Sequence, residues 1–308
     1  MISVIVPAHN SASTLNACLL ALQNQTVPRS EYEVILVDDG SSDGTTAIGR
    51  KLGVQVLRQA RRGPAAARNL GASVAQGDII LFTDSDCSPA PDWIEQMRRP
   101  FADSRVMGAK GVYASRQKQL LPRFIQVEYE DKYRRMARQA QIDFIDTYSA
   151  GYRRSLFLEQ GGFDIKFPDP SAEDVEFSFR LAKQGHRLVF APHAVVEHVH
   201  ATSLMYYLRR KWRYGYWRVW VYQRHPEKVR GDSHTAPELK VQLPAVGLCG
   251  LSALLSVAYP AFGLLALGSG FVFLLSTLPL LAGGLGAGFL AGRVGHWSAL
   301  WANRARLP

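Results

Sequence analysis

Short apolar runs alternate with helical stretches along the first third of the 308-residue chain, and this alternation restricts the fold more than any other feature. We expect buried strands at residues 3–6, 33–37, 54–58 and 78–83, separated by helices at residues 14–23, 42–52 and 63–75. Farther along, we expect helices at residues 118–141 and 173–184, with short strands between residues 143 and 196. Alternating strands and helices are typical of β-α-β units. The sequence therefore predicts an α/β fold with a Rossmann-like, mostly parallel sheet.

Polar side chains follow three of the predicted strands. Asn10 comes after the first, Asp38 and Asp39 after the second, and Asp84 and Asp86 after the fourth. In open α/β sheets, ligands bind beyond the carboxyl ends of the strands. We therefore expect these side chains to meet at one edge of the sheet and to form a ligand site there.

The segment Asp84-Ser85-Asp86 carries the sharpest chemical signal. Two carboxylates two residues apart, directly after a buried strand, concentrate negative charge that Mg²⁺ or Mn²⁺ can neutralise while bridging to substrate phosphates. When such a pair stands alone, a turn or helix cap is the favoured explanation. Its position after a predicted strand favours a metal site on Asp84 and Asp86.

The segment at residues 37–45 ends a strand and opens a helix, and two interpretations stay open. Asp38 and Asp39 exceed what a helix cap needs, and can accept hydrogen bonds from a nucleotide base or a ribose. The same segment matches the G-x-S-x-G nucleophile elbow, which would make Ser42 the nucleophile of a membrane-bound serine hydrolase. The hydrolase interpretation leaves the neighbouring acids unexplained.

Three other sites carry candidate residues. Arg68 lies on a helix made otherwise of small residues, and is either a solvent-facing side chain or a diphosphate ligand. Glu173 and Asp174 open a predicted helix, and the helix dipole favours acidic residues in the first turn. An ionised carboxylate at this position can also act as a general base. His198 and His200 end a strand, either as surface residues or with one of them as a metal ligand.

Residues 241–292 contain no Asp, Glu, Lys, Arg or His. Because a membrane-spanning helix needs about 20 apolar residues, this stretch predicts two spans, at residues 243–266 and 270–290. A buried helical hairpin is the alternative. We therefore divide the chain into an α/β domain at residues 1–202, an interfacial helical segment at 203–240, two transmembrane helices at 241–292 and a basic tail at 293–308.

The formal net charge of +10 is concentrated beside the predicted spans. Residues 203–240 hold nine Lys and Arg against three Asp and Glu, interleaved with Trp and Tyr. Basic residues beside a span favour the cytoplasmic side, and aromatic residues favour the interface with anionic lipids. We expect a multi-pass protein of the cytoplasmic membrane with a cytoplasmic catalytic domain, and no nucleic-acid partner. The three cysteines are far apart and indicate neither a disulfide scaffold nor a zinc site.

Taken in order and spacing, six segments resemble the family 2 glycosyltransferases with a GT-A fold. These segments are residues 4–10, 37–45, 63–71, 83–86, 161–164 and 173–176. The resemblance covers roughly residues 2–215 and assigns the GT-A catalytic domain to residues 1–202. It implies an inverting transfer of a sugar from a nucleotide-diphosphate sugar, with Mg²⁺ or Mn²⁺ as cofactor.

The resemblance also implies roles for single residues. It implies that Pro7, Ala8 and Asn10 line the nucleoside, that Asp38 or Asp39 contacts the base or ribose, and that Arg68 approaches the diphosphate. Asp84 would contact the ribose or the metal, and Ser85 would also contact the donor. Asp86 would be the principal metal ligand, Asp84 would share the metal, and His198 or His200 would help to hold it. The catalytic base is Asp174, with Glu173 beside it.

The sequence departs from the family pattern at several positions, and these departures bear on which kind of transferase it is. Ser11 stands where many relatives have Glu, and residues 149–152 replace a Gly-Asn pair on the acceptor side. The Q-x-x-R-W signature of processive synthases is absent, which argues against a polymerising synthase. A membrane location indicates a lipid-linked or envelope glycan as acceptor, and leaves the sugar and the base of the donor open. A nucleotide-sugar-binding protein without catalysis is a further alternative.

Overall fold

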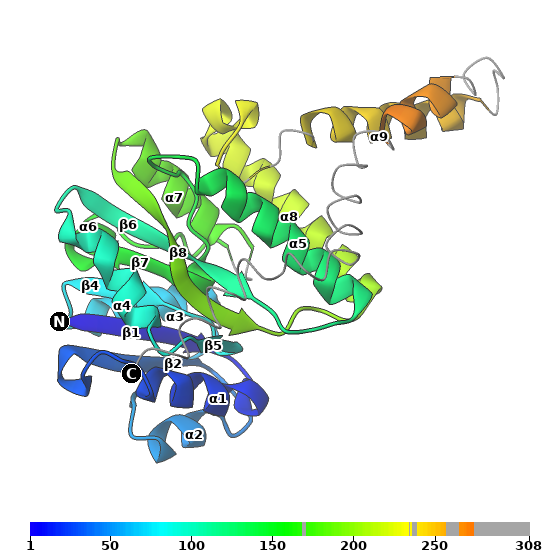
Figure 1. The fold of residues 1–308 in the computed structure, drawn as a ribbon. Coiled ribbons are helices and arrows are strands. Elements are labelled where there is room, and N and C mark those ends of the chain that lie inside the picture. Colours follow the sequence, from blue (N-terminus) through cyan, green and yellow to red (C-terminus); the bar gives the residue numbers. More distant parts are fainter. Residues whose placement is uncertain (168–170, 234, 236–238, 257–264, 274–308) are drawn as a thin grey trace. The chain divides into compact units, whose positions relative to one another are not determined.

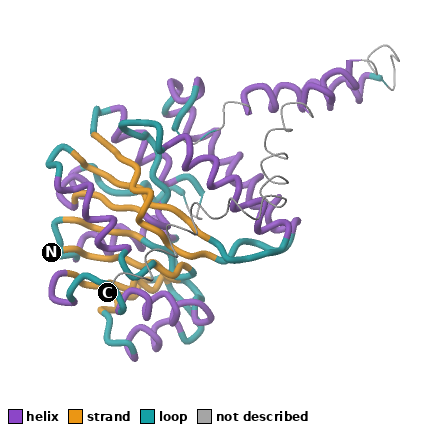
Figure 2. Tube along the Cα trace, viewed as in Figure 1, coloured by secondary structure: helices purple, strands orange, loops and turns teal. Residues whose placement is uncertain are grey.

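The computed structural model describes residues 1–167, 171–233, 235, 239–256 and 265–273. The chain divides into two compact units, Met1–His234 and a second that begins at Thr235. The first unit contains a central sheet with helices packed on both sides (Figure 1, Figure 2).

The described elements follow one another in a mixed α/β order. The strands are β1 (Ile2–Ala8), β2 (Tyr32–Asp39), β3 (Gln55–Gln59), β4 (Ile79–Phe82), β5 (Cys87–Pro89), β6 (Val106–Ala114), β7 (Ala150–Arg153) and β8 (Arg187–His198). The α-helices are α1 (Ala12–Gln23), α2 (Thr45–Lys51), α3 (Pro64–Val74), α4 (Trp93–Arg98), α5 (Leu120–Met136), α6 (Arg154–Glu159), α7 (Glu173–Lys183), α8 (Leu204–Arg224) and α9 (Leu239–Leu255). Short 3-10 helices lie at Arg29–Glu31, Arg99–Ala102, Thr147–Ser149 and Pro226–Arg230.

The strands form one eight-stranded sheet in the order β3-β2-β1-β4-β7-β6-β8-β5. The first four strands are parallel: β1 pairs with β2 and β4, and β2 pairs with β3. The second half of the sheet is mixed, because β7 runs antiparallel to β4 and β6, and β5 runs antiparallel to β8. The carboxyl ends of β1, β2 and β4 therefore lie side by side, as expected for a ligand-binding edge.

Alternating side chains of the central strands feed two separate hydrophobic cores. Val4 and Val6 of β1 pack in the core that contains α1 and α4, whereas Ile5 packs in the core that contains α3, α6 and α7. Successive strand residues point to opposite faces, so an uninterrupted apolar run requires burial on both sides. The apolar runs predicted at residues 3–6, 33–37 and 78–83 are confirmed as buried central strands, whereas the run predicted at residues 54–58 corresponds to β3, a partly exposed strand at the edge of the sheet.

The structure differs from the predicted elements at several boundaries. The helix predicted from residue 42 begins at Thr45, because side chains of the preceding loop bond to backbone N–H groups outside the helix; one such bond joins Asp43 Oδ2 to the N–H of Ala12. The helix predicted at residues 118–141 spans only Leu120–Met136. Strands β5 and β7 have three and four residues, too few to show a recognisable alternation in the sequence.

The described residues of the second unit cover only part of the predicted membrane hairpin. Helix α9 has 17 residues; it begins four residues before the first predicted span, at residues 243–266, and covers the first half of it. None of the helices in the described residues is both long and apolar enough to cross a bilayer. Residues 257–264 of the first span, residues 274–290 of the second and the basic tail at 293–308 lie outside the described residues, so the hairpin stays a prediction.

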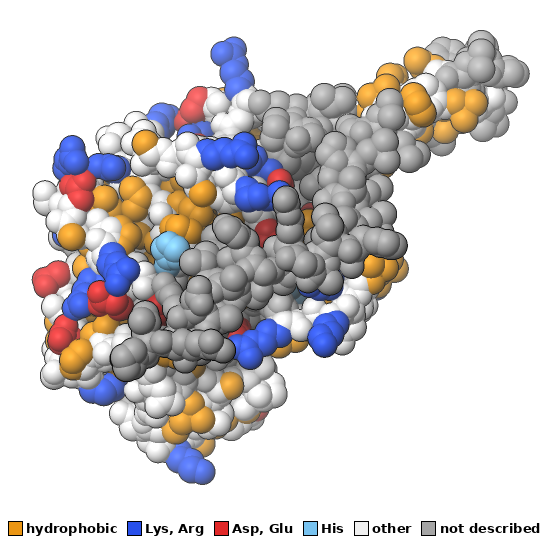
Figure 3. All heavy atoms as spheres, viewed as in Figure 1, with side chains coloured by type: hydrophobic (Ala, Val, Ile, Leu, Met, Phe, Trp, Pro, Cys, Tyr) orange, Lys and Arg blue, Asp and Glu red, His pale blue; other side chains and the backbone are white. Residues whose placement is uncertain are grey.

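Charge is dispersed over the face of the described residues that Figure 3 shows. Lys and Arg side chains are scattered across it, and several lie beside Asp or Glu. Among the described ion pairs, Arg98 bonds to Glu31 and Glu95, and Arg105 bonds to Asp103.

The close packing of α3 on the sheet makes a stability prediction. A Cβ added at Gly71 would lie 2.5 Å from Cγ2 of Ile5 and 3.2 Å from Cγ2 of Val37. We expect Gly71→Ala to lower the free energy of unfolding by about 1–3 kcal/mol, because overpacking strains a close-packed core. The same change at Gly215 of α8, where the structure describes nothing within 4 Å, should raise it by about 0.5–1 kcal/mol. Urea denaturation of both variants measures the contrast, and equal effects would contradict it.

Candidate active site

The loops after β1, β2 and β4 are joined to one another by hydrogen bonds. Asn10 adopts a left-handed backbone conformation with φ of 50°, and its N–H donates to Ser41 Oγ at 2.9 Å. Its side-chain oxygen accepts from the N–H of Ser42 at 2.9 Å. Ser85 Oγ donates to Ser11 Oγ at 2.8 Å, which links the segment after β4 to the loop after β1. These loops therefore form one connected rim above the last residues of β1, Pro7 and Ala8.

Asp38 is fully buried at the end of β2 and orders the loop that follows it. Its Oδ1 accepts from the N–H of Ser41 at 2.9 Å, and its Oδ2 accepts from Thr46 Oγ1. Burial by itself would raise the pKa of Asp38, but the hydrogen bonds from Ser41 and Thr46 outweigh it and lower the pKa below its ordinary value. The Asp38 carboxylate is therefore ionised, and both of its oxygens accept hydrogen bonds from the segment that follows it.

Asp39 joins the end of β2 to the start of α3. Its Oδ1 accepts from Gln59 Nε2 at 2.7 Å and from the N–H of Arg62 at 2.8 Å, and its Oδ2 accepts from the N–H of Gly63 at 2.9 Å. These bonds fix the approach to α3 and hence the position of that helix's first turn. Contact of Asp38 or Asp39 with a base or ribose stays a prediction.

Arg68 of α3 lies buried between two carboxylates that are far apart in the sequence. Its Nη2 donates to Asp84 Oδ1 at 2.8 Å, and its Nη1 donates to Glu173 Oε1 at 2.9 Å. The Arg68 side chain is 4% exposed and the Glu173 side chain 3%. Arg68 thus ties the start of α7 to the aspartate segment after β4, a role that the sequence did not reveal. Its predicted contact with a diphosphate stays untested.

Asp174 lies half-buried beside this ion pair, in the first turn of α7. Its Oδ2 accepts from the N–H of Thr147 at 3.2 Å, and its Oδ1 accepts from the N–H of Val175 at 2.8 Å. Burial and the neighbouring Glu173 carboxylate raise the pKa of Asp174 to about 7, although Arg68 opposes the shift. A carboxyl group poised near neutral pH is suited to general base catalysis.

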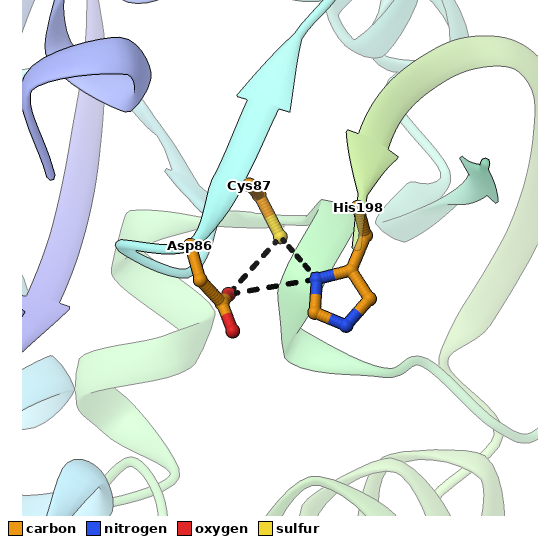
Figure 4. Close-up of side chains that lie close together, drawn as sticks. All are labelled: Asp86, Cys87 and His198. Atoms are coloured by element: carbon orange, nitrogen blue, oxygen red, sulfur yellow. Dashed lines mark hydrogen bonds and ion pairs between the residues drawn. The ribbon is translucent and has the colours of Figure 1, made fainter. Parts of the chain in front are cut away.

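Asp86, Cys87 and His198 bring three metal-ligating side chains together where β5 begins and β8 ends (Figure 4). Asp86 Oδ1 lies 3.7 Å from His198 Nδ1, and the Asp86 side chain is 51% exposed. An exposed carboxylate beside an imidazole is a donor set that a divalent cation can use, with Asp84 adjacent in sequence. Asp86 and His198 therefore fit Mg²⁺ or Mn²⁺, whereas Asp84 bonds to Arg68 and its contact with the ion stays a prediction.

His200 has different surroundings from His198, although both were candidates for the metal. Its Nε2 lies 2.9 Å from Gln126 Oε1 of α5, and its ring stacks on Tyr129 at 5.7 Å between centroids. Burial, together with His198 and Arg210, lowers the pKa of His200 to about 3, so its ring is neutral at physiological pH. The structure does not place His200 in the cluster of Asp86, Cys87 and His198.

A buried polar group behind Asp174 was missed in the sequence. Lys110 of β6 is 1% exposed, and its ammonium group contacts the Asp146 carboxylate and lies 3.1 Å from Tyr148 Oη. Asp146 directly precedes Thr147, whose N–H binds Asp174. Burial lowers the pKa of Lys110 well below its ordinary value. A single Lys within an apolar stretch was the only signal available, and it does not indicate a partner.

Ser42 lacks the surroundings of a hydrolase nucleophile in the described residues. It is exposed, and its Oγ lies 3.4 Å from Asn10 Oδ1, whereas none of the described hydrogen bonds joins it to a histidine. A serine nucleophile requires a base within hydrogen-bond reach. The geometry therefore gives the serine hydrolase alternative no support.

Comparison with known proteins shows that this chain matches a family of glycosyltransferases. The model of the family described as Glycosyl transferase family 2 matches residues 3–161, just over half of the chain. The pre-mycofactocin glycosyltransferase of Mycobacterium tuberculosis is 29% identical over 249 residues, covering 74% of this chain and 49% of that protein. The glycosyltransferase AglE of Haloferax volcanii is 41% identical over 101 residues, covering 31% of this chain and 33% of AglE. The chain thus spans half or less of the length of these relatives.

Solved structures share the fold. A mannosyltransferase of Pyrobaculum calidifontis in complex with GDP-Man and Mn²⁺ has a TM-score of 0.58 and 22% identity, covering 99% of this chain and 79% of that one. The structure of GalNAc-T7 with UDP, GalNAc and Mn²⁺ has a TM-score of 0.53 and 20% identity, covering 66% of this chain and 44% of that one. These similarities show a mixed α/β fold of the GT-A type.

The two ion pairs of Arg68 allow a prediction, because the stability lost on removing an arginine depends on how deeply its partners are buried. We expect Arg68→Met to lower the free energy of unfolding by about 3–5 kcal/mol, because it leaves the Glu173 carboxylate buried and unpaired. Arg98 is the matched control: it also bonds to two carboxylates, at 2.8 Å and 2.5 Å, but its side chain is 42% exposed. We expect Arg98→Met to cost less than about 1 kcal/mol. Chemical denaturation measures both, and similar losses would refute the argument.

Proposed function

This chain belongs to glycosyl transferase family 2, and we propose that it transfers a sugar, with inversion, from a nucleotide-diphosphate sugar to an acceptor hydroxyl using Asp174 as the general base. It is a nucleotide-sugar glycosyltransferase with a GT-A-like fold. Inversion is what the family resemblance implies, and the site geometry supports the base and the cation.

One observation carries the proposal, namely the link that Arg68 makes between two parts of the site. Arg68 bonds to Asp84 in the aspartate segment and to Glu173, the neighbour of Asp174. A common buried side chain therefore holds Asp84, two residues before Asp86, and Glu173, the residue before the proposed base. Positioning two reacting groups in this way is a principal source of rate enhancement.

Asp174 supplies the proton acceptor in a single displacement. The acceptor hydroxyl gives its proton to the Asp174 carboxylate as its oxygen bonds to the anomeric carbon. The bond from that carbon to the diphosphate oxygen breaks at the same time, and the nucleoside diphosphate leaves with the electron pair. Because attack and departure take place on opposite sides of the carbon, the configuration inverts. The N–H of Thr147 orients the carboxylate.

A divalent cation, Mg²⁺ or Mn²⁺, held by Asp86 with Asp84 and His198 would supply positive charge where the diphosphate leaves. Asp84 already bonds to Arg68, and Asp86 is the more exposed of the two carboxylates. Asp86 is therefore the principal ligand in our proposal. The mannosyltransferase of Pyrobaculum calidifontis, solved in complex with GDP-Man and Mn²⁺, supports a metal in this fold.

The proposed acceptor is a lipid-linked or envelope glycan at the cytoplasmic membrane face, and α8 supports it. Five exposed side chains, Met205, Leu208, Trp212, Tyr216 and Val219, recur at helical spacing. At about 100° per residue they fall within about 80° of one face of the helix. Tyr207 and Val221 lie buried on the opposite face.

Basic residues complete this apolar stripe, which consists of those five side chains of α8. Arg209 and Arg213 follow Leu208 and Trp212 directly in the sequence. An apolar face with flanking Arg and Trp is typical of a helix that lies in a membrane interface with anionic lipids. The predicted spans at residues 243–266 and 270–290 would anchor the chain in the same membrane.

Asp174→Asn tests the base. We expect kcat to fall by about 10²–10⁴-fold while donor affinity stays nearly unchanged, because general base catalysis contributes about that factor. In the wild type, kcat/KM should fall as the pH drops below about 7, because the Asp174 carboxyl, with its pKa of about 7, is protonated there. Steady-state kinetics from pH 5 to 9 and donor titration measure both effects.

Glu197→Gln is the control for the loss of a carboxylate. Glu197 pairs with Arg116 at the surface, and its replacement should leave turnover within about twofold. Activity retained in Asp174→Asn would exclude Asp174 as the base. Donor bound without transfer or hydrolysis in the wild type would favour the non-catalytic alternative.

The apolar stripe of α8 makes a second prediction. In a Cys249→Ser background, a polarity-sensitive dye attached at Trp212→Cys should shift to the blue when vesicles of phosphatidylcholine and phosphatidylglycerol are added. The same dye at Arg105→Cys, whose side chain is 76% exposed elsewhere on the first unit, should not shift. The effect should weaken in vesicles without phosphatidylglycerol, because anionic lipid attracts Arg. Equal responses at both positions would contradict an interfacial α8.

A further inference from the structure

Cys87 directly follows the aspartate segment and was not assigned any role from the sequence. It begins β5, which runs antiparallel to β8 so that Cys87 stands opposite His198. Its Sγ lies 3.6 Å from Asp86 Oδ1 and 4.0 Å from His198 Nδ1. Figure 4 shows the three side chains pointing toward one another, Cys87 from β5, His198 from β8 and Asp86 from the turn before β5.

We propose that Asp86, Cys87 and His198 form a binding site for a thiophilic divalent cation, Zn²⁺, whose occupancy inhibits sugar transfer. The inhibitory effect rests on the proposed function, because Asp86 is the principal ligand for the catalytic Mg²⁺ or Mn²⁺. The zinc site itself rests on the geometry alone.

The spacing of the three ligand atoms fits a tetrahedral ion. With Zn–S at about 2.3 Å and Zn–N or Zn–O at about 2.0 Å, tetrahedral ligands lie about 3.5 Å apart if one is sulfur and about 3.3 Å apart otherwise. The observed distances are 3.6 Å and 4.0 Å from sulfur, and 3.7 Å between Asp86 Oδ1 and His198 Nδ1. Each exceeds the tetrahedral value by about half an ångström or less, so small side-chain movements would close the site around an ion.

The ligand atoms of this cluster differ from those of an ordinary site for a hard cation. Mg²⁺ and Mn²⁺ prefer oxygen ligands, whereas a thiolate and an imidazole favour Zn²⁺, which also stands above Mn²⁺ in intrinsic affinity. Cys87 gives up its proton to solvent when the ion binds, as metal-bound thiols do. Zinc would therefore compete for Asp86 and His198 with the added strength of a sulfur ligand.

The surroundings hold the ligands in place and leave one coordination position open. The ring of Tyr113 stacks on His198 with 4.6 Å between centroids, and its hydroxyl lies 3.8 Å from Cys87 Sγ. Such neighbours orient metal ligands. Cys87 is buried, whereas the Asp86 side chain is 51% exposed, so the fourth position faces outward. An open position of that kind can take water or a phosphate oxygen.

Cadmium titration of the full chain tests the site, because Cd²⁺ bound to a thiolate gives a charge-transfer absorption band in the ultraviolet. We expect the band in the wild type and in Cys249→Ser, and its loss in Cys87→Ser and in Cys87→Ala. Isothermal titration with Zn²⁺ should show that Cys87→Ser lowers zinc affinity by at least about tenfold, because the soft ligand is removed. Absence of the band in the wild type, or its persistence in both Cys87 variants, would overturn the proposal.

Transfer assays separate this proposal from the proposed function. With Mn²⁺ present, added Zn²⁺ should slow the wild type and slow Cys87→Ser at least about tenfold less effectively. Equal inhibition of the two proteins would refute a role for Cys87. If no transfer occurs with Mn²⁺ alone, the proposed function fails, while the cadmium band still decides whether the zinc site exists. Circular dichroism of Cys87→Ser and Cys87→Ala verifies that both variants fold.

Discussion

Arg68 holds two carboxylates that arrive from distant parts of the chain, and the rest of the site depends on this interaction. Asp84 follows β4, whereas Glu173 opens α7, 105 residues after Arg68. The buried Glu173 carboxylate would be costly to bury alone, and a guanidinium with two charge-assisted bonds compensates for that cost. The position of α3, which carries Arg68, is fixed in turn by Asp39 through the N–H groups of Arg62 and Gly63.

This arrangement gives neighbouring acids different protonation behaviour. Asp38 accepts hydrogen bonds from its own loop, which lower its pKa, whereas burial beside Glu173 raises the pKa of Asp174 to about 7. Asp86 stays exposed, next to a thiol and an imidazole. One edge of the sheet thus contains a structural acid, a proposed base and a proposed metal ligand. Their environments, not their residue type, distinguish these roles.

The sequence predicted the first half of the fold well, because long apolar runs and helical spacing are local signals. The predicted strands at residues 3–6, 33–37 and 78–83 correspond to β1, β2 and β4, and the polar residues after them meet at one edge. The antiparallel strands β5 and β7 were missed, because three or four residues carry no periodic pattern. Their pairing depends on partners far away in the sequence.

The sequence by itself determined the family, the ligand-binding edge of the sheet and the residue types available there. Only the tertiary structure decided which residues act on one another. It paired Arg68 with Glu173, set His198 beside Asp86 and turned His200 toward Gln126. It also brought Cys87 opposite His198, although the spacing of cysteines in the sequence indicated no zinc site. The physical reason is that local patterns fix which segments become strands and helices, whereas contacts across the sheet depend on how those segments pack.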